Sequence, residues 1–144
     1  MPNKGEMVQT LSNYTVKKLR HPTQMTLESD LQWVCHSLGF MGKRDLDNTA
    51  YKILRALMRS AKNKKGMTSE ELTEKVKPTI GSVIYHLKKL MKAGLVVKFG
   101  STYELRMESL VSTIDEIKKE INITLADIMK VAKDIDNKIG LDNR

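Results

Sequence analysis

The sequence predicts a mainly α-helical fold with a small β-hairpin, followed by one long C-terminal helix. Apolar residues recur at helical spacing in several segments, a short β-rich run follows Gly94, and one apolar stripe continues from residue 107 to residue 139. A chain of 144 residues is long enough for one domain with an appended helix. We divide it into a basic flexible arm, a helical domain with a hairpin, and a long helix, at residues 1–25, 26–107 and 108–144.

Two helices are predicted at the start of the domain. The first runs from Thr26, which can cap it, to about Phe40, and its apolar stripe is Leu27, Leu31, Val34 and Leu38. The second begins after Asp47 as its N-cap and continues to about Ser60, with an apolar face made of Ala50, Ile53, Leu54, Leu57 and Met58. Each helix is expected to bury that face in the core.

Residues 68–78 predict a short third helix with marked ends. Thr68 and Glu71 have the spacing of a capping box, in which each side chain accepts a hydrogen bond from the backbone of the other. Pro78 has no amide hydrogen and disfavours helical backbone at Lys77, so the helix should end there. Thr79 then fits the N-cap of a new helix.

The helix that follows Thr79 has two unlike faces. Its apolar stripe is made of Ile80, Ile84, Leu87 and Met91, widened by Val83 and Leu90. The opposite face is polar and basic, with Thr79, Ser82, Tyr85, His86, Lys89 and Lys92. Gly94 is placed to end the helix as its C′ residue.

A β-hairpin is predicted directly after this helix. Leu95 to Phe99 is rich in β-forming residues, and Thr102 to Leu105 would be the return strand. Gly100 and Ser101 fit a two-residue type II′ turn, which needs glycine first. Helix, turn, helix and hairpin in this order make a helix-turn-helix with a wing.

The run IYHLKKLMKAGLV resembles the recognition-helix signature of ArsR/MarR-type winged-helix transcription regulators. The resemblance covers roughly residues 45–107 and is strongest over Val83 to Val97. It implies that Ser82, Tyr85 and Lys89 face the major groove of DNA, with Thr79 touching bases or phosphate. It also places Lys88, Lys89 and Lys92 near phosphates, while an ordinary solvated helix face is the competing interpretation.

The wing departs from the pattern of these regulators, many of which have a longer wing tip with an arginine. Here the tip is only Gly100 and Ser101, so minor-groove readout is not expected, although Lys98 and Arg106 are within reach of phosphate. Two further interpretations stay open. Lysines of the loop at residues 61–66 either contact the DNA backbone or are merely solvated (Lys62, Lys64 and Lys65), and His86 is either structural or on the DNA side.

Positive charge is concentrated in the first part of the chain. The net charge is +8, but residues 1–107 have 19 Lys and Arg against 9 Asp and Glu, whereas residues 108–144 have 6 against 8. Residues 1–25 are polar and basic and are expected to form a loose arm. The asymmetry is typical of a protein that meets phosphate groups through its helix-turn-helix.

From Met107 to Ile139 the pattern predicts one helix of roughly 50 Å. A helix of that length projects beyond a small domain, so its apolar stripe needs a partner. We expect a homodimer formed through a coiled coil or helix pair, with a helix folded back on its own domain as the alternative. The predicted dimerisation residues are Leu110, Ile114, Ile117, Ile121, Leu125, Ile128, Ala132 and Ile135.

No catalytic constellation or cofactor motif is evident, and we expect neither enzyme activity nor a cofactor. Cys35 and His36 are adjacent, so they point about 100° apart on a helix and chelate poorly; we interpret Cys35 as a small buried residue and expect no metal. No apolar run is long enough for a membrane helix, and no secretory signal is apparent. A cytoplasmic location is expected, in a bacterium or archaeon if the resemblance holds.

These observations favour a homodimeric, sequence-specific regulator of transcription that binds double-stranded DNA. Two other hypotheses stay open. One is a winged-helix adaptor in a multi-subunit assembly, which would need no basic face. The other is a regulator that senses an unidentified small effector.

Overall fold

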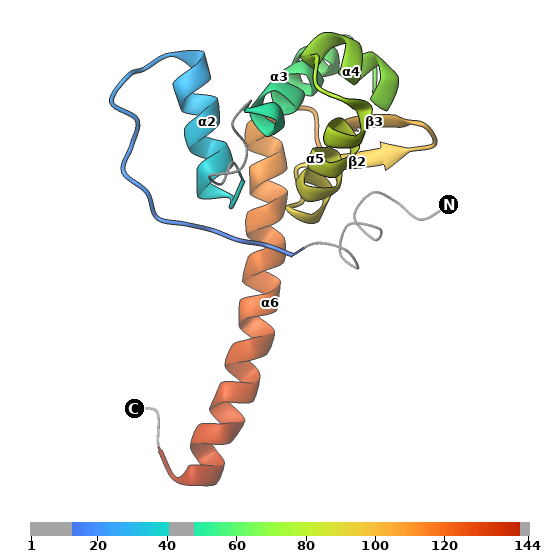
Figure 1. Ribbon diagram of the computed structural model, residues 1–144. Helices are drawn as coiled ribbons and strands as arrows, with labels where there is room; N and C mark the ends of the chain where they lie inside the picture. The colour runs from blue at the N-terminus through green and yellow to red at the C-terminus, as the bar shows by residue number, and fades with distance from the viewer. Residues whose placement is uncertain (1–12, 41–47, 142–144) are drawn as a thin grey trace.

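A computed structural model describes residues 13–40 and 48–141 of the chain (Figure 1). It is mainly helical, with a small antiparallel sheet and a long C-terminal helix, so the predicted fold class is confirmed. In chain order the elements are α2 (Leu27–Ser37), α3 (Thr49–Ala61), β1 (Met67–Thr68), α4 (Ser69–Val76), α5 (Ile80–Lys92), β2 (Val96–Phe99), β3 (Thr102–Leu105) and α6 (Leu110–Ile139).

Helix α3 lies at the centre of the domain. It packs against α2, α4, α5 and β3, while α4 and α5 also pack against each other. The side chains that meet there are fully buried, and they include Ile53, Leu54, Leu57, Leu72, Val83, Leu87 and Leu90. Burying a side chain of this size stabilises the fold by roughly 1.5–3 kcal/mol, so packing against α3 and α4 holds α5 in place.

The start of α3 differs from the prediction. Asp47, the predicted cap, lies outside the described residues, and the N-cap position is occupied by Asn48. Asn48 has a left-handed backbone with φ of 55° and makes no side-chain capping hydrogen bond. Asparagine adopts this backbone region more readily than most residues. Asn48 can therefore begin α3 without a capping hydrogen bond from its side chain.

The sheet contains one strand that the sequence analysis did not predict. Its strand order is β1-β3-β2, both pairings are antiparallel, and β1 pairs Met67 with Tyr103. Between β2 and β3, Phe99 pairs with Thr102 across the two-residue turn, and Gly100 has φ of 58°. Positive φ at the first turn residue agrees with the type II′ turn expected for Gly100 and Ser101.

Two apolar residues predicted in buried stripes are instead exposed. Ile80 is 43% exposed and Leu27 is 60% exposed, and each is the first residue of its helix. Helical periodicity gives the direction of a side chain but not how far the neighbouring element extends along the axis. The buried side of α5 is therefore centred on Val83, Leu87 and Leu90.

Residues 13–25 make several contacts with the domain, in contrast to the loose arm predicted for residues 1–25. The Asn13 amide donates to the Lys92 carbonyl at 2.6 Å, and the Lys17 amide donates to the Ser37 carbonyl at 2.7 Å. The Trp33 indole N–H donates to the Arg20 carbonyl at 2.6 Å. The backbone from residue 13 to residue 20 is thus attached at the ends of α5 and α2 and along α2.

Helix α6 has a first part that packs on the domain and a second part that projects from it (Figure 1). Leu110, Ile117 and Ile121 belong to or pack against the core of their own domain. Ile117 is only 2% exposed, so its side chain is already covered within its own domain, while dimerisation through these three residues stays a prediction. From Leu125 onward the stripe is exposed, by 50% at Leu125 and 57% at Ile128.

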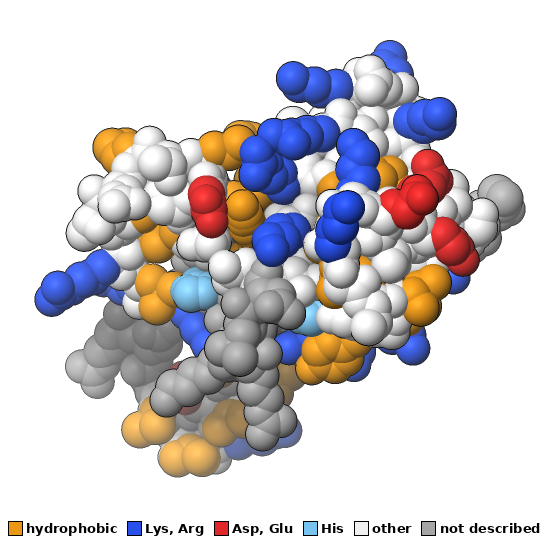
Figure 2. All heavy atoms as spheres, turned by 45° about the horizontal axis from the view of Figure 1, so that its top comes forward, with side chains coloured by type: hydrophobic (Ala, Val, Ile, Leu, Met, Phe, Trp, Pro, Cys, Tyr) orange, Lys and Arg blue, Asp and Glu red, His pale blue; other side chains and the backbone are white. Residues whose placement is uncertain are grey.

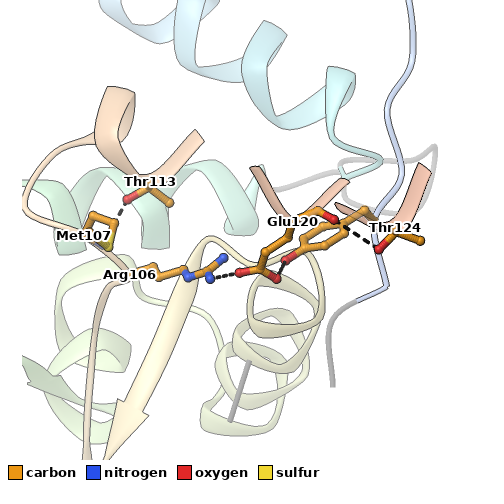
Figure 3. A network of polar contacts seen from close by, with 6 residues as sticks. Arg106, Met107, Thr113, Glu120 and Thr124 are labelled. Atoms are coloured by element: carbon orange, nitrogen blue, oxygen red, sulfur yellow. Dashed lines mark hydrogen bonds and ion pairs between the residues drawn. The ribbon is translucent and has the colours of Figure 1, made fainter. Parts of the chain in front are cut away.

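A polar network joins the packed part of α6 to the end of the hairpin (Figure 3). Arg106 directly follows β3 and is only 3% exposed, and its guanidinium donates to the Glu120 carboxylate. The Tyr14 hydroxyl donates to the other oxygen of the same carboxylate at 2.5 Å. Thr113 accepts from the Met107 amide at 3.1 Å. The first part of α6 is therefore held by hydrogen bonds as well as by apolar packing.

Candidate nucleic-acid interface

The helix-turn-helix consists of α4 and α5, and the start of α4 is capped as predicted. The Glu71 amide donates to the Thr68 hydroxyl, and the Thr68 amide donates to the Glu71 carboxylate, both at 3.1 Å. The hydrogen bond from the Thr68 backbone is the main cause that lowers the pKa of Glu71 below its ordinary value of 4.5. The capping box thus fixes the residue at which α4 begins.

The turn between the two helices is made by three consecutive residues. Lys77 ends α4 with a left-handed backbone at φ of 77°, and its amide donates to the Thr73 carbonyl. Pro78 follows, and the Thr79 hydroxyl then accepts from the Ser82 amide at 3.2 Å. This confirms Thr79 as the N-cap, and the cap sets the direction in which α5 leaves the turn.

The open face of α5, which we define as Ser82, Tyr85, Lys88, Lys89 and Lys92, is turned away from the core. Tyr85 is 57% exposed, the three lysines are exposed, and Ser82 is half-buried. The Lys89 ammonium lies 5.2 Å from the centre of the Tyr85 ring, within cation–π range. The open face therefore combines positive charge with one aromatic and one hydroxyl side chain.

His86 lies at the edge of the open face and is half-buried. Its Nδ1 is 2.8 Å from the Ser82 carbonyl, and its ring meets the Tyr85 ring edge-on with centres 5.1 Å apart. These contacts restrict the rotamers of both rings. His86 thus supports the position of Tyr85.

The first turn of α5 contains two exposed residues that sequence reasoning did not include in the site. Ile80 was expected in the core, but it is 43% exposed at the end of α5 that follows the turn. Gly81 is exposed as well, and a Cβ atom built there would meet nothing within 4 Å. The open space around Gly81 is what distinguishes it from a glycine required by packing. This space is visible only in the structure.

The wing presents less basic surface than the sequence suggested. Lys98 on β2 is exposed, with its ammonium 5.4 Å from the centre of the Tyr103 ring on the paired strand. Arg106 was expected within reach of phosphate. It is instead buried against Glu120, and its guanidinium cannot contact DNA unless that pair is broken.

The three loop lysines are exposed but do not lie with the open face of α5. Lys64 and Lys65 line a groove of about 400 Å³ together with Glu104 and Glu108, and no residue of α5 lines it. Lys64 has φ of 51° in the turn after α3, and Lys62 precedes it. The structure thus brings together, on α5 and its N-cap, Thr79, Ser82, Tyr85, His86, Lys88, Lys89 and Lys92. It leaves Lys64 and Lys65 in a separate groove with acidic residues, and Lys62 is exposed in the turn before them.

Figure 2 shows the face of the domain that lies at the top of Figure 1, where Lys and Arg side chains gather and a few acidic side chains lie on either side of them. Among the described residues there is no group of three or more His, Cys, Asp or Glu side chains arranged to hold a metal ion. Within the same residues, each helix is too short or too polar to cross a membrane. Cys35 is fully buried, as predicted.

Comparison with known proteins agrees with this architecture. Residues 46–97 match a family model described as winged helix-turn-helix DNA-binding. The matched segment includes α3, β1, α4 and α5 and reaches into β2, so it covers the helix-turn-helix and the start of the wing. Searches of curated proteins and of solved structures found no match. The similarity supports a winged helix-turn-helix that binds DNA and does not distinguish its subtypes.

Proposed function

We propose that this chain is a sequence-specific regulator of transcription that binds double-stranded DNA as a homodimer, in the cytoplasm of a bacterium or archaeon. The main supporting observation is the open face of α5, where a capped helix presents Tyr85 and three exposed lysines away from the core. The similarity of residues 46–97 to a DNA-binding family supports the same function. The run from Ile84 to Val96 supports an ArsR/MarR-type assignment as part of the proposal.

In this proposal the first turns of α5 meet base edges in the major groove. Helices of helix-turn-helix proteins read bases mainly with residues near their N-terminus. Thr79, Ser82 and Tyr85 can exchange hydrogen bonds with bases, and Lys89 can donate to guanine. Ile80 adds an apolar contact suited to the methyl group of thymine, because its side chain is exposed at the same end.

The other basic side chains would contact phosphates and so set the position of α5 on the duplex. Lys88 and Lys92 are exposed farther along α5, and Lys98 is exposed on β2. Phosphate contacts add affinity that is independent of sequence and falls as salt rises. Lys62, Lys64 and Lys65 are proposed as weaker phosphate contacts. Lys64 and Lys65 share a groove with Glu104 and Glu108, whose negative charges oppose phosphate binding.

Dimerisation is assigned to the projecting part of α6. Leu125, Ile128, Ala132, Ile135 and Ile139 follow at alternating spacings of three and four residues, and all five are exposed. A pair of such helices would bury the stripe as a coiled coil. Two heads related by a two-fold axis would then bind half-sites about 34–36 Å apart, or a multiple of that distance.

The test is a selection of duplexes from a random library by the purified protein, followed by binding titrations on the selected sequence. We expect a sequence with two-fold symmetry. The variant Ser82→Ala/Tyr85→Ala/Lys89→Ala should lose at least about tenfold in affinity for the selected duplex relative to a scrambled one. The matched control is Lys130→Ala/Lys133→Ala, which lies on α6 away from the stripe.

Two results would contradict the proposal. If the triple variant kept the wild-type ratio of affinities for the selected and the scrambled duplex, the open face would not be the base-reading surface. Failure of the wild-type protein to enrich any duplex, or to bind duplex at low salt, would favour a protein-interaction adaptor instead. Variants Lys88→Gln and Lys92→Gln should each weaken binding to all sequences alike and lower the salt slope by about 1.

A further inference from the structure

A second basic surface lies between α3 and α4, away from the open face of α5. It is a shallow groove of about 180 Å³. Helix α3 supplies four of its lining residues and α4 supplies two, and none comes from α5 or the wing. The lining residues are Lys52, Arg55, Ala56, Arg59, Lys75 and Val76. Figure 2 views the molecule from the side of α3 and α4 and shows basic side chains gathered there.

The charge pattern of this groove is one-sided. Lys52, Arg55 and Arg59 are three and four residues apart, so they follow one side of α3, and the helix contains no acidic residue. Like charges at these spacings repel each other and disfavour the helix. Lys75 adds a fourth positive charge from α4, and no acidic residue lines the groove. An anion bound in the groove would attract all four cations and so offset the repulsion between them.

The Arg55 guanidinium is held in a position that suits an anionic ligand. It is half-buried, and one of its terminal nitrogens is 3.5 Å from the Tyr51 hydroxyl. Its Nε atom is buried and has no hydrogen-bond partner among the described residues. A buried donor without a partner is unfavourable. Because this Nε atom is closed to solvent, an oxyanion in the groove could accept from it only after a small movement of the Arg55 side chain.

The lining residues favour a nucleic-acid backbone over an acidic protein segment. Lys52 and Arg59 are seven residues apart, or about 10 Å along α3, which matches the rise along the DNA axis of roughly three nucleotides of one strand. Arginine pairs with phosphate through two parallel hydrogen bonds. The centres of protein interfaces are enriched in aromatic side chains, whereas the apolar part of this groove is only Ala56 and Val76.

We propose that the groove between α3 and α4 binds consecutive phosphates of a DNA backbone, as a second contact in addition to that of α5. This inference rests on the proposed function, because it assumes that duplex DNA is the partner. The groove shares no residue with the open face of α5. We assign it to the flank of the duplex that α5 binds, and binding of a second duplex is the alternative.

The test compares two full-length variants that lose the same charge. Lys52→Gln/Arg59→Gln removes two exposed cations of the groove and leaves the half-buried Arg55 in place. Lys130→Gln/Lys133→Gln removes two exposed cations from α6. Binding to a random-sequence duplex of about 40 bp, longer than two half-sites, is measured by fluorescence anisotropy between about 50 and 200 mM salt.

We expect the groove variant to bind the duplex at least about tenfold more weakly than the α6 variant, with a salt slope smaller by about 2 per protomer. Equal affinity and slope for the two variants, with wild-type binding intact, would overturn the groove site alone. No duplex binding by the wild-type protein would overturn the proposed function and the groove site together. Binding of polyglutamate that depends on Lys52 and Arg59, with duplex binding unaffected, would assign the groove to an acidic protein and refute the proposal.

Discussion

Arg106 and Glu120 form a buried ion pair that links the end of the hairpin to the fourth turn of α6. Arg106 directly follows β3, and Glu120 also accepts from the Tyr14 hydroxyl. Three segments distant in the sequence therefore converge on one carboxylate. The direction in which α6 leaves the domain depends on this contact as well as on the apolar packing of Ile117.

Removal of the carboxylate should destabilise the protein strongly. The variant Glu120→Ala leaves the Arg106 guanidinium buried without a counter-charge, which costs about 3–5 kcal/mol in comparable sites. The double variant Arg106→Met/Glu120→Leu removes both charges and should recover most of that loss. Urea denaturation of the three proteins gives the free energies of unfolding. A Glu120→Ala protein within about 0.5 kcal/mol of the wild type would show that the pair contributes little.

Gly81 in the first turn of α5 and Gly94 just after its end should respond oppositely to alanine. Gly81→Ala adds a Cβ atom that meets nothing, so it should stabilise the helix by up to about 1 kcal/mol. Gly94 has φ of 82°, and a Cβ there would lie 2.8 Å from a ring carbon of Tyr14. Gly94→Ala should therefore cost at least about 1–2 kcal/mol from the left-handed backbone alone. Thermal unfolding measures both, and equal shifts would contradict the assigned environments.

Gly81→Ala also reports on how closely α5 approaches DNA. If the backbone at Gly81 lies against the duplex, the added methyl group should reduce affinity even though the fold is more stable. Binding to the selected duplex, measured beside the unfolding experiment, separates the two effects. If Gly81→Ala were more stable than the wild type and bound the duplex with the same affinity, the duplex would not lie against this residue.

Stability should depend on pH through Glu71. Its pKa is lower in the folded protein than in the unfolded chain, because the Thr68 amide donates to the carboxylate. The capping box therefore contributes its full stability above the ordinary pKa of 4.5 and loses it as the pH falls through the lower folded value. An NMR titration should give a Glu71 midpoint below 4.5. The variant Glu71→Gln keeps an acceptor without a titrating group and should lack this component of the pH dependence.

The projecting part of α6 should determine the oligomeric state without affecting the head. Leu125→Asp/Ile128→Asp places charges in the exposed stripe and should give a monomer in analytical ultracentrifugation. The domain should keep its melting temperature, since neither residue is buried in it. The control Lys130→Asp/Lys133→Asp changes the opposite side of the same helix and should stay dimeric. A wild-type monomer, or a dimeric stripe variant, would refute the dimerisation surface.

Much of the fold could be predicted because short-range signals agree with one another. Thr68 with Glu71, Pro78 with Thr79, and Gly94 after the last lysine each mark a helix end through local backbone chemistry. The two-residue turn at Gly100 likewise needs only its neighbours. Contacts between distant segments were missed. Two residues are too few for β1 to show a strand pattern, and nothing near Tyr14 in the sequence indicates that its partner is Glu120.

The candidate site was predictable to a similar degree. Helical periodicity distinguished the open face of α5 from its buried side, so Tyr85 and Lys89 were identified. Periodicity could not show that Ile80 lies beyond the end of the core, nor that Arg106 is withdrawn into an ion pair. Both outcomes depend on where other segments of the chain lie in the folded domain, which local sequence patterns do not indicate.

The position of β3 between β1 and β2 also has a consequence for the order in which the domain can form. β3 is the last of the three strands to be synthesised and lies between the other two. β1 and β2 therefore have no partner in the sheet until β3 has emerged from the ribosome. A fragment that ends at Val97, although it includes both helices of the helix-turn-helix, lacks the strand on which its two other strands depend. Any shortened chain that is to keep the whole sheet beside α5 must therefore continue at least through β3, to Leu105.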